Sequence, residues 1–119
     1  MIVEDDEASR YGLKSVLESE GYSVVEAASL AEAEQKSRQQ NPDVAILDIT
    51  LPDGDGAEWL ERARKRGGEI AFPVIALTGV TADEDRRRIE HAGVHAVLYK
   101  PVNVHLLFDA LKDCLQPQA

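Results

Sequence analysis

The sequence predicts an α/β fold: a doubly wound, five-stranded parallel sheet with helices on both faces. Five short apolar runs, each followed by a longer amphipathic segment, alternate along the 119 residues. The later runs are almost continuously apolar, which is typical of strands buried on both faces. Repeated strand–helix alternation indicates parallel strands joined by right-handed crossovers. We therefore expect one domain over residues 1–119.

The expected elements follow one another without a linker. The apolar runs, taken as strands, occupy residues 2–3, 22–25, 44–47, 74–77 and 94–98. The amphipathic segments, taken as helices, occupy residues 8–20, 30–40, 56–66, 82–92 and about 103–115. Apolar residues recur three or four positions apart in these segments, so one stripe of each helix is expected to face the sheet.

Local signals mark the ends of these helices. A capping box, in which serine or threonine is followed three residues later by glutamate, begins the second and fourth helices at residues 29–32 and 81–84. Glycines, which are typical of helix C-termini, follow the first, third and fourth helices at Gly21, Gly67 and Gly93. The last helix is expected to turn one apolar stripe inward, formed by Leu106, Leu107, Ala110, Leu111 and Cys114.

Composition excludes several classes of function. The chain has 13 basic and 22 acidic side chains and a net charge of −9. Direct nucleic-acid binding needs a concentrated basic face, so we do not expect it. No apolar run approaches the roughly 20 residues that span a bilayer, and the acidic start is unlike a signal peptide. We expect a cytoplasmic domain with no membrane contact. The single cysteine excludes an intrachain disulfide.

Polar side chains stand at the carboxyl ends of four expected strands. They are Glu4, Asp5 and Asp6 after the first, Asp48 after the third, Thr78 after the fourth and Lys100 after the fifth. Ligands of open parallel sheets bind at this edge, so we expect these groups to converge. Oxygen-only ligands favour Mg²⁺ over zinc, and a lysine beside a hydroxyl suits phosphoryl oxygens. The pattern predicts phosphoryl transfer to an aspartate nucleophile.

These motifs resemble the receiver domain of response regulators, the CheY-like phosphoacceptor module of two-component signalling. The resemblance covers essentially the whole chain. It rests on four stretches, VEDD at 3–6, ILDITLPDGDG at 46–56, IALTG at 75–79 and YKP at 99–101. It implies the flavodoxin-like, CheY-like (βα)₅ fold with strand order 2-1-3-4-5.

The resemblance assigns chemical roles by position. Asp48 matches the phosphoacceptor, Thr78 the switch hydroxyl and Lys100 the lysine that pairs with the phosphoryl group. Pro101 matches the proline that usually follows this lysine through a cis peptide bond.

The resemblance also implies Mg²⁺ as the cofactor. Asp5 and Asp48 match carboxylate ligands, and Glu4 is expected to act through water. The backbone carbonyl of Thr50 is expected to complete the protein's share of the ligands. Asp6 occupies a variable position and is not assigned to the metal.

Further positions concern structure and switching. Pro52 and Gly56 match the loop that leads from the phosphoacceptor into the third helix. Val97 stands where receiver domains usually have an aromatic residue. Valine is too small to signal the state of the site by a large rotamer change. Tyr99 lies on the same face of the strand, so Thr78, Val97 and Tyr99 are the switch candidates.

The partners that the resemblance implies are a histidine kinase or a histidine phosphotransfer domain. A fused effector or kinase domain is compatible with the sequence. The residues at 75–79, 84–88 and 100–102 most resemble those of the receivers in hybrid histidine kinases. The domain is expected to be a monomer or a weak, phosphorylation-dependent dimer. It is a signalling module rather than an enzyme, although it would catalyse its own phosphorylation and dephosphorylation.

Three alternatives remain. A haloacid-dehalogenase-like phosphatase would need a second aspartate where Thr50 stands. A flavodoxin-like electron carrier would need a phosphate-binding loop where residues 4–7 are acidic. A receiver-like module that interacts independently of phosphorylation is the third alternative. Incubation with a small phosphodonor and Mg²⁺ separates all three from a functional receiver.

Overall fold

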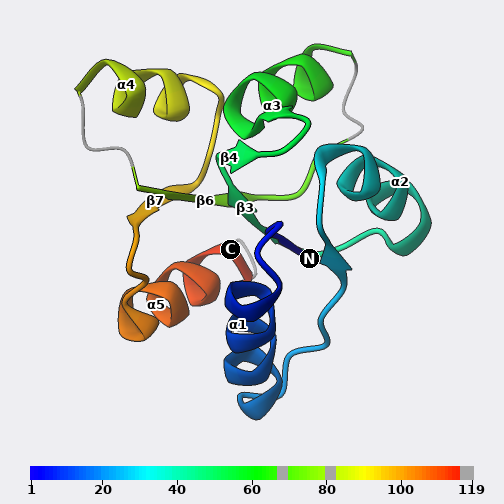
Figure 1. Ribbon diagram of the computed structural model, residues 1–119, viewed down its shortest axis with the longest axis vertical. Coiled ribbons are helices and arrows are strands. Elements are labelled where there is room, and N and C mark those ends of the chain that lie inside the picture. Colours follow the sequence, from blue (N-terminus) through cyan, green and yellow to red (C-terminus); the bar gives the residue numbers. More distant parts are fainter. Residues whose placement is uncertain (67–69, 80–82, 116–119) are drawn as a thin grey trace.

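A five-stranded parallel sheet forms the centre of the computed structural model, which describes residues 1–66, 70–79 and 83–115. Its strands are β1 (Ile2–Val3), β2 (Glu26–Ala27), β3 (Ala45–Asp48), β6 (Val74–Thr78) and β7 (Ala96–Tyr99). They lie in the order β2-β1-β3-β6-β7 (Figure 1). Numbered along the chain, these five strands have the order 2-1-3-4-5, so the doubly wound prediction is confirmed.

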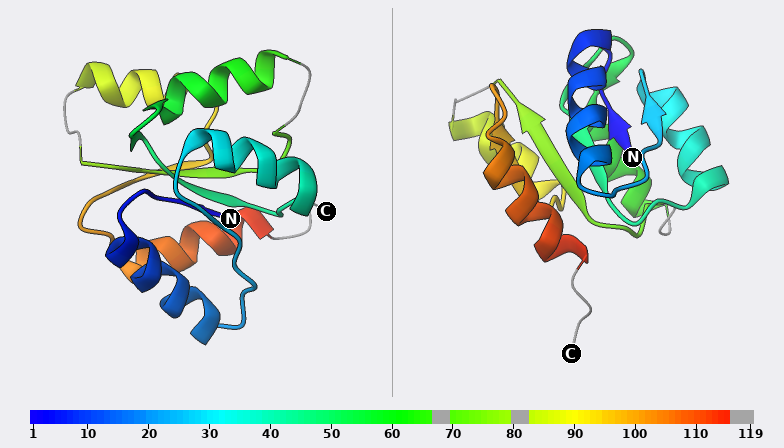
Figure 2. Two further views of the ribbon diagram at one scale, coloured as in Figure 1. Left: turned by 45° about the vertical axis from the view of Figure 1, so that its right-hand side comes forward. Right: turned by 90° about the horizontal axis from the view of Figure 1, so that it is seen from below.

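Helices cover both faces of this sheet. They are α1 (Glu7–Ser19), α2 (Leu30–Gln40), α3 (Gly56–Lys65), α4 (Asp83–His91) and α5 (Val104–Leu115). Figures 1 and 2 show α2, α3 and α4 on one face and α1 and α5 on the other. Side chains alternate along a strand, so Leu47 and Ala76 pack toward α2–α4, whereas Ile46 and Ile75 pack toward α1 and α5. Burial on both faces explains the continuous apolar runs.

The second strand lies further along the chain than the apolar run at 22–25 predicts. Strand β1 contains only two residues, and their register partners are Glu26 and Ala27. Ile2 N donates to Val25 O and Glu4 N donates to Ala27 O, so backbone pairing with β1 reaches only the last residue of the predicted run. Tyr22 and Val24 are half-buried and pack against the cluster formed by α1, α5 and their face of the sheet. Their hydrophobicity reflects this packing and does not mark a strand.

A small hairpin separates β3 from α3 where the sequence indicated only a loop. Strands β4 (Thr50–Leu51) and β5 (Gly54–Asp55) pair antiparallel. Pro52 and Asp53 form the turn between them. Strands of two residues are too short to produce a recognisable alternation of apolar and polar residues, which is why the hairpin was missed.

Helix boundaries can be checked wherever the structure describes them. Ser29 Oγ accepts a hydrogen bond from Glu32 N at 3.2 Å, so the first capping box is confirmed. The second capping box, at residues 81–84, begins at a residue outside the described ranges. In α5, Leu107 is buried but Leu106 is 54% exposed, so its assignment to the inner stripe was wrong. Consecutive residues point about 100° apart around a helix.

No described helix is both long and apolar enough to cross a membrane.

Candidate functional site

Three carboxylates meet at the carboxyl edge of the central strands. Glu4 and Asp5 follow β1, and Asp48 ends the neighbouring β3. One oxygen from each carboxylate lies within 4.8 Å of those of the other two. Glu4 and Asp48 are only 2% and 3% exposed, whereas Asp5 faces solvent. The structure therefore brings together three acidic residues that the sequence places at two strand ends.

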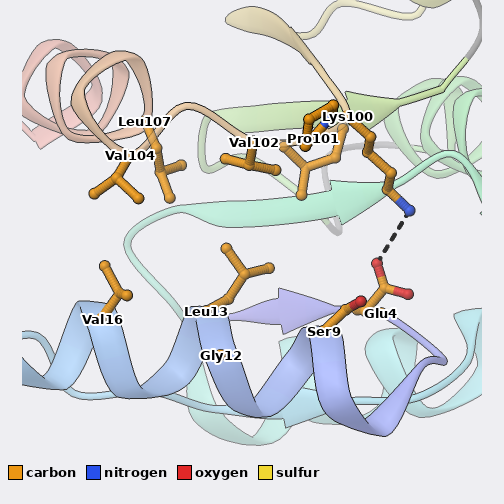
Figure 3. A pocket seen from close by; sticks show the side chains of 11 residues that line it. Glu4, Ser9, Gly12, Leu13, Val16, Lys100, Pro101, Val102, Val104 and Leu107 are labelled. Carbon is orange, nitrogen blue, oxygen red and sulfur yellow. Dashed lines mark hydrogen bonds and ion pairs between the residues drawn. The ribbon is translucent and has the colours of Figure 1, made fainter.

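Lys100 connects the two buried carboxylates. Its Nζ donates to Asp48 Oδ2 at 2.8 Å and to Glu4 Oε2 at 3.4 Å. Figure 3 shows the second of these contacts. The other Asp48 oxygen, Oδ1, accepts a hydrogen bond from the Thr50 backbone N–H at 3.1 Å. Both oxygens of the expected phosphoacceptor are thus oriented by donors.

The protonation behaviour of the site follows from burial and from this ion pairing. Burial raises the pKa of Glu4, and the adjacent Asp48 carboxylate raises it further, although Lys100 and a backbone N–H oppose the shift. Burial alone would lower the pKa of Lys100, but Asp48 and Glu4 together outweigh it and raise the pKa. Lys100 therefore remains a cation at neutral pH, facing two carboxylates.

Asp6 organises the start of α1. Its Oδ2 accepts from Ser9 N at 2.9 Å, which makes it the N-cap of the helix. Its own N–H donates to Glu4 Oε1 at 3.1 Å. Asp6 lies outside the cluster formed by Glu4, Asp5 and Asp48.

The first residue of α3, Gly56, follows the hairpin and lies close to the backbone of Asp48. Gly56 N donates to Ile49 O at 2.8 Å, and a Cβ at Gly56 would lie 2.8 Å from the Asp48 carbonyl oxygen. Only glycine leaves room for this approach, which gives Gly56 a steric reason.

Two aspartates anchor this hairpin to neighbouring helices, and the sequence analysis missed both contacts. The Asp53 carboxylate accepts from the N–H groups of Leu30 and Ala31 at the start of α2, at 2.9 and 3.1 Å. Asp55 is the N-cap of α3, and its Oδ1 also accepts from Arg88 Nη1 on α4 at 2.8 Å. The segment that follows the phosphoacceptor is thereby linked to α2, α3 and α4.

The switch candidates lie on the two last strands of the sheet. Thr78 ends β6, is 2% exposed and is the register partner of Tyr99 on β7. Lys100 N donates to Thr78 O at 2.9 Å, and the Lys100–Pro101 peptide is cis, as the resemblance implies. Val97 packs against the cluster beneath α2–α4, and Tyr99 is half-buried.

An apolar groove adjoins the site. It has a volume of about 470 Å³ and runs between α1 and α5 (Figure 3). Gly12, Leu13 and Val16 line it from α1, and Val104 and Leu107 line it from α5. Glu4 and Lys100 also border the groove, so it opens directly beside the carboxylate cluster.

The donor set suits a hard divalent cation. All the candidate ligand atoms in the cluster are carboxylate oxygens, and two of the three carboxylates, those of Glu4 and Asp48, are buried. Mg²⁺ prefers such ligands and binds one or two carboxylates, leaving positions for water and phosphate. A buried carboxylate that faces an ammonium and a cation site is suited to attack a phosphoryl group.

The chain is similar to known response regulators. Residues 1–112 match the family described as the response regulator receiver domain. The polar-differentiation response regulator DivK of Brucella ovis is 34% identical over 119 residues, with 97% of this chain and 94% of DivK covered. The KDP operon transcriptional regulatory protein KdpE of Escherichia coli K12 is 35% identical, with 98% of this chain covered but only 50% of KdpE. The chain thus spans half the length of that regulator.

Solved structures have the same architecture. A CheY-like response regulator receiver domain from Methanospirillum hungatei has a TM-score of 0.84 and 37% identity, with 94% of this chain and 88% of that chain covered. A two-component response regulator from Clostridium difficile has a TM-score of 0.88 and 28% identity, with coverages of 96% and 92%. The fold is therefore of the CheY-like type.

Proposed function

Because the chain belongs to the response regulator receiver domain family, we propose that it is the phosphoacceptor switch of a two-component phosphorelay in the cytoplasm. Asp48 accepts the phosphoryl group from a phosphohistidine of a histidine kinase or histidine phosphotransfer domain, with Mg²⁺ as cofactor. The observation that carries this proposal is the contact of Lys100 with buried Asp48 beside Glu4 and Asp5.

The proposed transfer is a nucleophilic displacement at phosphorus. A carboxylate oxygen of Asp48 attacks, a P–O bond forms, and the P–N bond to histidine breaks with its electron pair remaining on the nitrogen. The Lys100 ammonium and the Thr78 hydroxyl donate to the phosphoryl oxygens. Asp5, Asp48 and the Thr50 carbonyl would hold Mg²⁺, with Glu4 acting through water, and the ion would supply positive charge against those oxygens.

The proposed reset is hydrolysis of the aspartyl phosphate. Water attacks phosphorus, the bond between Asp48 and phosphorus breaks, and inorganic phosphate leaves the regenerated carboxylate. The domain acts on no other substrate in this scheme, so it is a signalling switch that catalyses its own two steps.

Mg²⁺ is expected to stabilise the folded domain. The carboxylates of Glu4, Asp5 and Asp48 converge only in the folded chain, so the cation binds that state by preference. At a concentration a hundredfold above its Kd, it should add about 2.7 kcal/mol to the free energy of unfolding. Thermal melting with and without Mg²⁺ measures this effect, and Asp5→Asn should reduce it. A melting curve unmoved by millimolar Mg²⁺ would contradict the cation site.

The groove between α1 and α5 is the proposed contact for the helix that carries the donor's phosphohistidine. It is apolar, and it opens beside Glu4 and Lys100. Gly12 lines the groove, and a Cβ there would have no atom within 4 Å, so Gly12→Leu should place its side chain in the groove. This variant is expected to accept phosphate normally from a small phosphodonor but to slow at least tenfold with a phosphorylated histidine phosphotransfer domain that labels the wild type.

Gly12→Ala is the matched control for that experiment. Alanine also replaces glycine in the helix but leaves most of the groove open, so transfer from the protein donor should resemble the wild type. Equal transfer rates for Gly12→Leu and Gly12→Ala would show that the donor does not use the groove.

Tyr99 is proposed to share the switching role with Thr78. The two residues are register partners, and Val97 is too small to report the state of the site by a large rotamer change. Tyr99→Ala is expected to alter the amide chemical-shift response of residues 83–105 to a phosphoryl mimic, while phosphorylation itself persists. Tyr11→Ala, at an exposed position on α1, is the control. Identical shift maps for wild type and Tyr99→Ala would show that Tyr99 only covers the sheet and has no role in switching.

A further inference from the structure

Arg10 joins the loop that carries Glu4 and Asp5 to the neighbouring strand. Its Nη1 donates to the Glu4 backbone carbonyl at 2.8 Å, and its Nε donates to Glu26 Oε1 at 3.3 Å. The side chain is only 18% exposed. One guanidinium thus spans from the acidic pair after β1 to β2, and the charge pattern of the sequence did not indicate this contact.

The Arg10 contact completes a set of bonds around Glu4. Glu4 N donates to Ala27 O at 3.0 Å, and Glu4 Oε1 accepts from Asp6 N. The carbonyl held by Arg10 belongs to the peptide unit that joins Glu4 to Asp5. Its orientation therefore sets the direction in which both carboxylates leave the backbone.

We infer that Arg10 is the positioning residue of the divalent-cation site. By bonding the Glu4 carbonyl and Glu26 together, it holds the loop so that the carboxylates of Glu4 and Asp5 stay directed at Asp48. Like charges within 4.8 Å repel one another, and a loop without this anchor relaxes to separate them. This inference rests on the proposed function, because the cation is the one proposed there.

Positioning and charge predict opposite effects for the loss of Arg10. The guanidinium is a cation close to an acidic cluster, and by charge alone its removal would strengthen Mg²⁺ binding. If Arg10 positions the ligands, its removal must weaken binding despite the more negative field. Partners that orient metal ligands typically contribute about 10–100-fold to affinity. Weaker Mg²⁺ binding after the loss of Arg10 therefore indicates a positioning role, and stronger binding indicates an effect of charge alone.

The experiment is calorimetric titration of folded protein with Mg²⁺ alone, for the wild type, Arg10→Gln, Arg10→Lys and Lys14→Gln. Arg10→Gln is expected to raise the Kd for Mg²⁺ about tenfold. Lys14 also pairs with Glu26, at 3.2 Å, but has no contact to the Glu4 carbonyl. Lys14→Gln therefore removes a neighbouring charge only, and it should leave the affinity unchanged or slightly higher.

Arg10→Lys keeps the charge, but the single ammonium of lysine cannot bond the Glu4 carbonyl and Glu26 in the way that the forked guanidinium does. The affinity of this variant for Mg²⁺ should therefore fall between those of the wild type and Arg10→Gln. This variant decides the question if Arg10→Gln does not fold. Wild-type affinity in Arg10→Lys, or unchanged or tighter binding in Arg10→Gln, would overturn the positioning role. Failure of the wild type to bind Mg²⁺ would instead contradict the proposed function, and it is seen before any variant is compared.

Discussion

Asp48→Asn is expected to abolish phosphoryl labelling by a small phosphodonor in the presence of Mg²⁺. The amide has no carboxylate oxygen to attack phosphorus, so incorporation should fall from one phosphoryl group per chain to background. The side chain keeps its size and an acceptor for the Thr50 N–H, so the domain should still fold. Intact-mass measurement detects the loss, and thermal melting verifies folding.

Asp53→Asn provides the matched control. Asp53 lies on the hairpin that follows Asp48, but its carboxylate accepts from N–H groups at the start of α2 and lies outside the cluster of Glu4, Asp5 and Asp48. Labelling of this variant should equal that of the wild type. Strong labelling of Asp48→Asn at another residue would overturn the assignment of the phosphoacceptor.

Gly56→Ala is expected to have a large effect without altering any group that reacts. The added Cβ would lie 2.8 Å from the Asp48 carbonyl oxygen and 3.2 Å from Ile49 Cα. Both neighbours are backbone atoms next to the phosphoacceptor, so relief of the clash must move Asp48 itself. Overpacking of this kind lowers the free energy of unfolding by about 1–3 kcal/mol. The labelling rate should fall with it, because Asp48 loses its alignment with Lys100.

Urea denaturation measures the stability change, and Gly12→Ala is the control. Gly12 lies within α1 and has open space for a Cβ, so alanine there should raise stability by about 0.5–1 kcal/mol. If Gly56→Ala were as stable as the wild type, the close approach at Gly56 would have no energetic importance.

The sequence was sufficient to place the main parts of the candidate site. Glu4, Asp48, Thr78 and Lys100 each stand at the end of an apolar run, and parallel strands bring those ends to one edge. Their convergence is therefore a consequence of topology, which strand–helix alternation reveals. Strand–helix alternation also predicted helices on both faces of the sheet, whereas the strand order was implied by the resemblance to receiver domains.

The supporting contacts could not be predicted, because they join residues far apart in sequence. Asp53 caps α2 from 23 positions away, and Arg88 reaches Asp55 across 33 positions. Local patterns carry no signal for such tertiary caps. Strand β2 was misplaced for a related reason: its position depends on the short strand β1 opposite it, rather than on its own hydrophobicity.

Phosphorylation of Asp48 is tested most directly by a time course of phosphoryl content and position in the wild-type protein. The protein is incubated with a small phosphodonor and Mg²⁺, and peptide mass analysis locates the modification. We expect one phosphoryl group on Asp48, dependent on Mg²⁺, that disappears from the folded protein once the donor is removed. No labelling, as expected of a module that interacts independently of phosphorylation, or stable labelling elsewhere, would contradict this prediction.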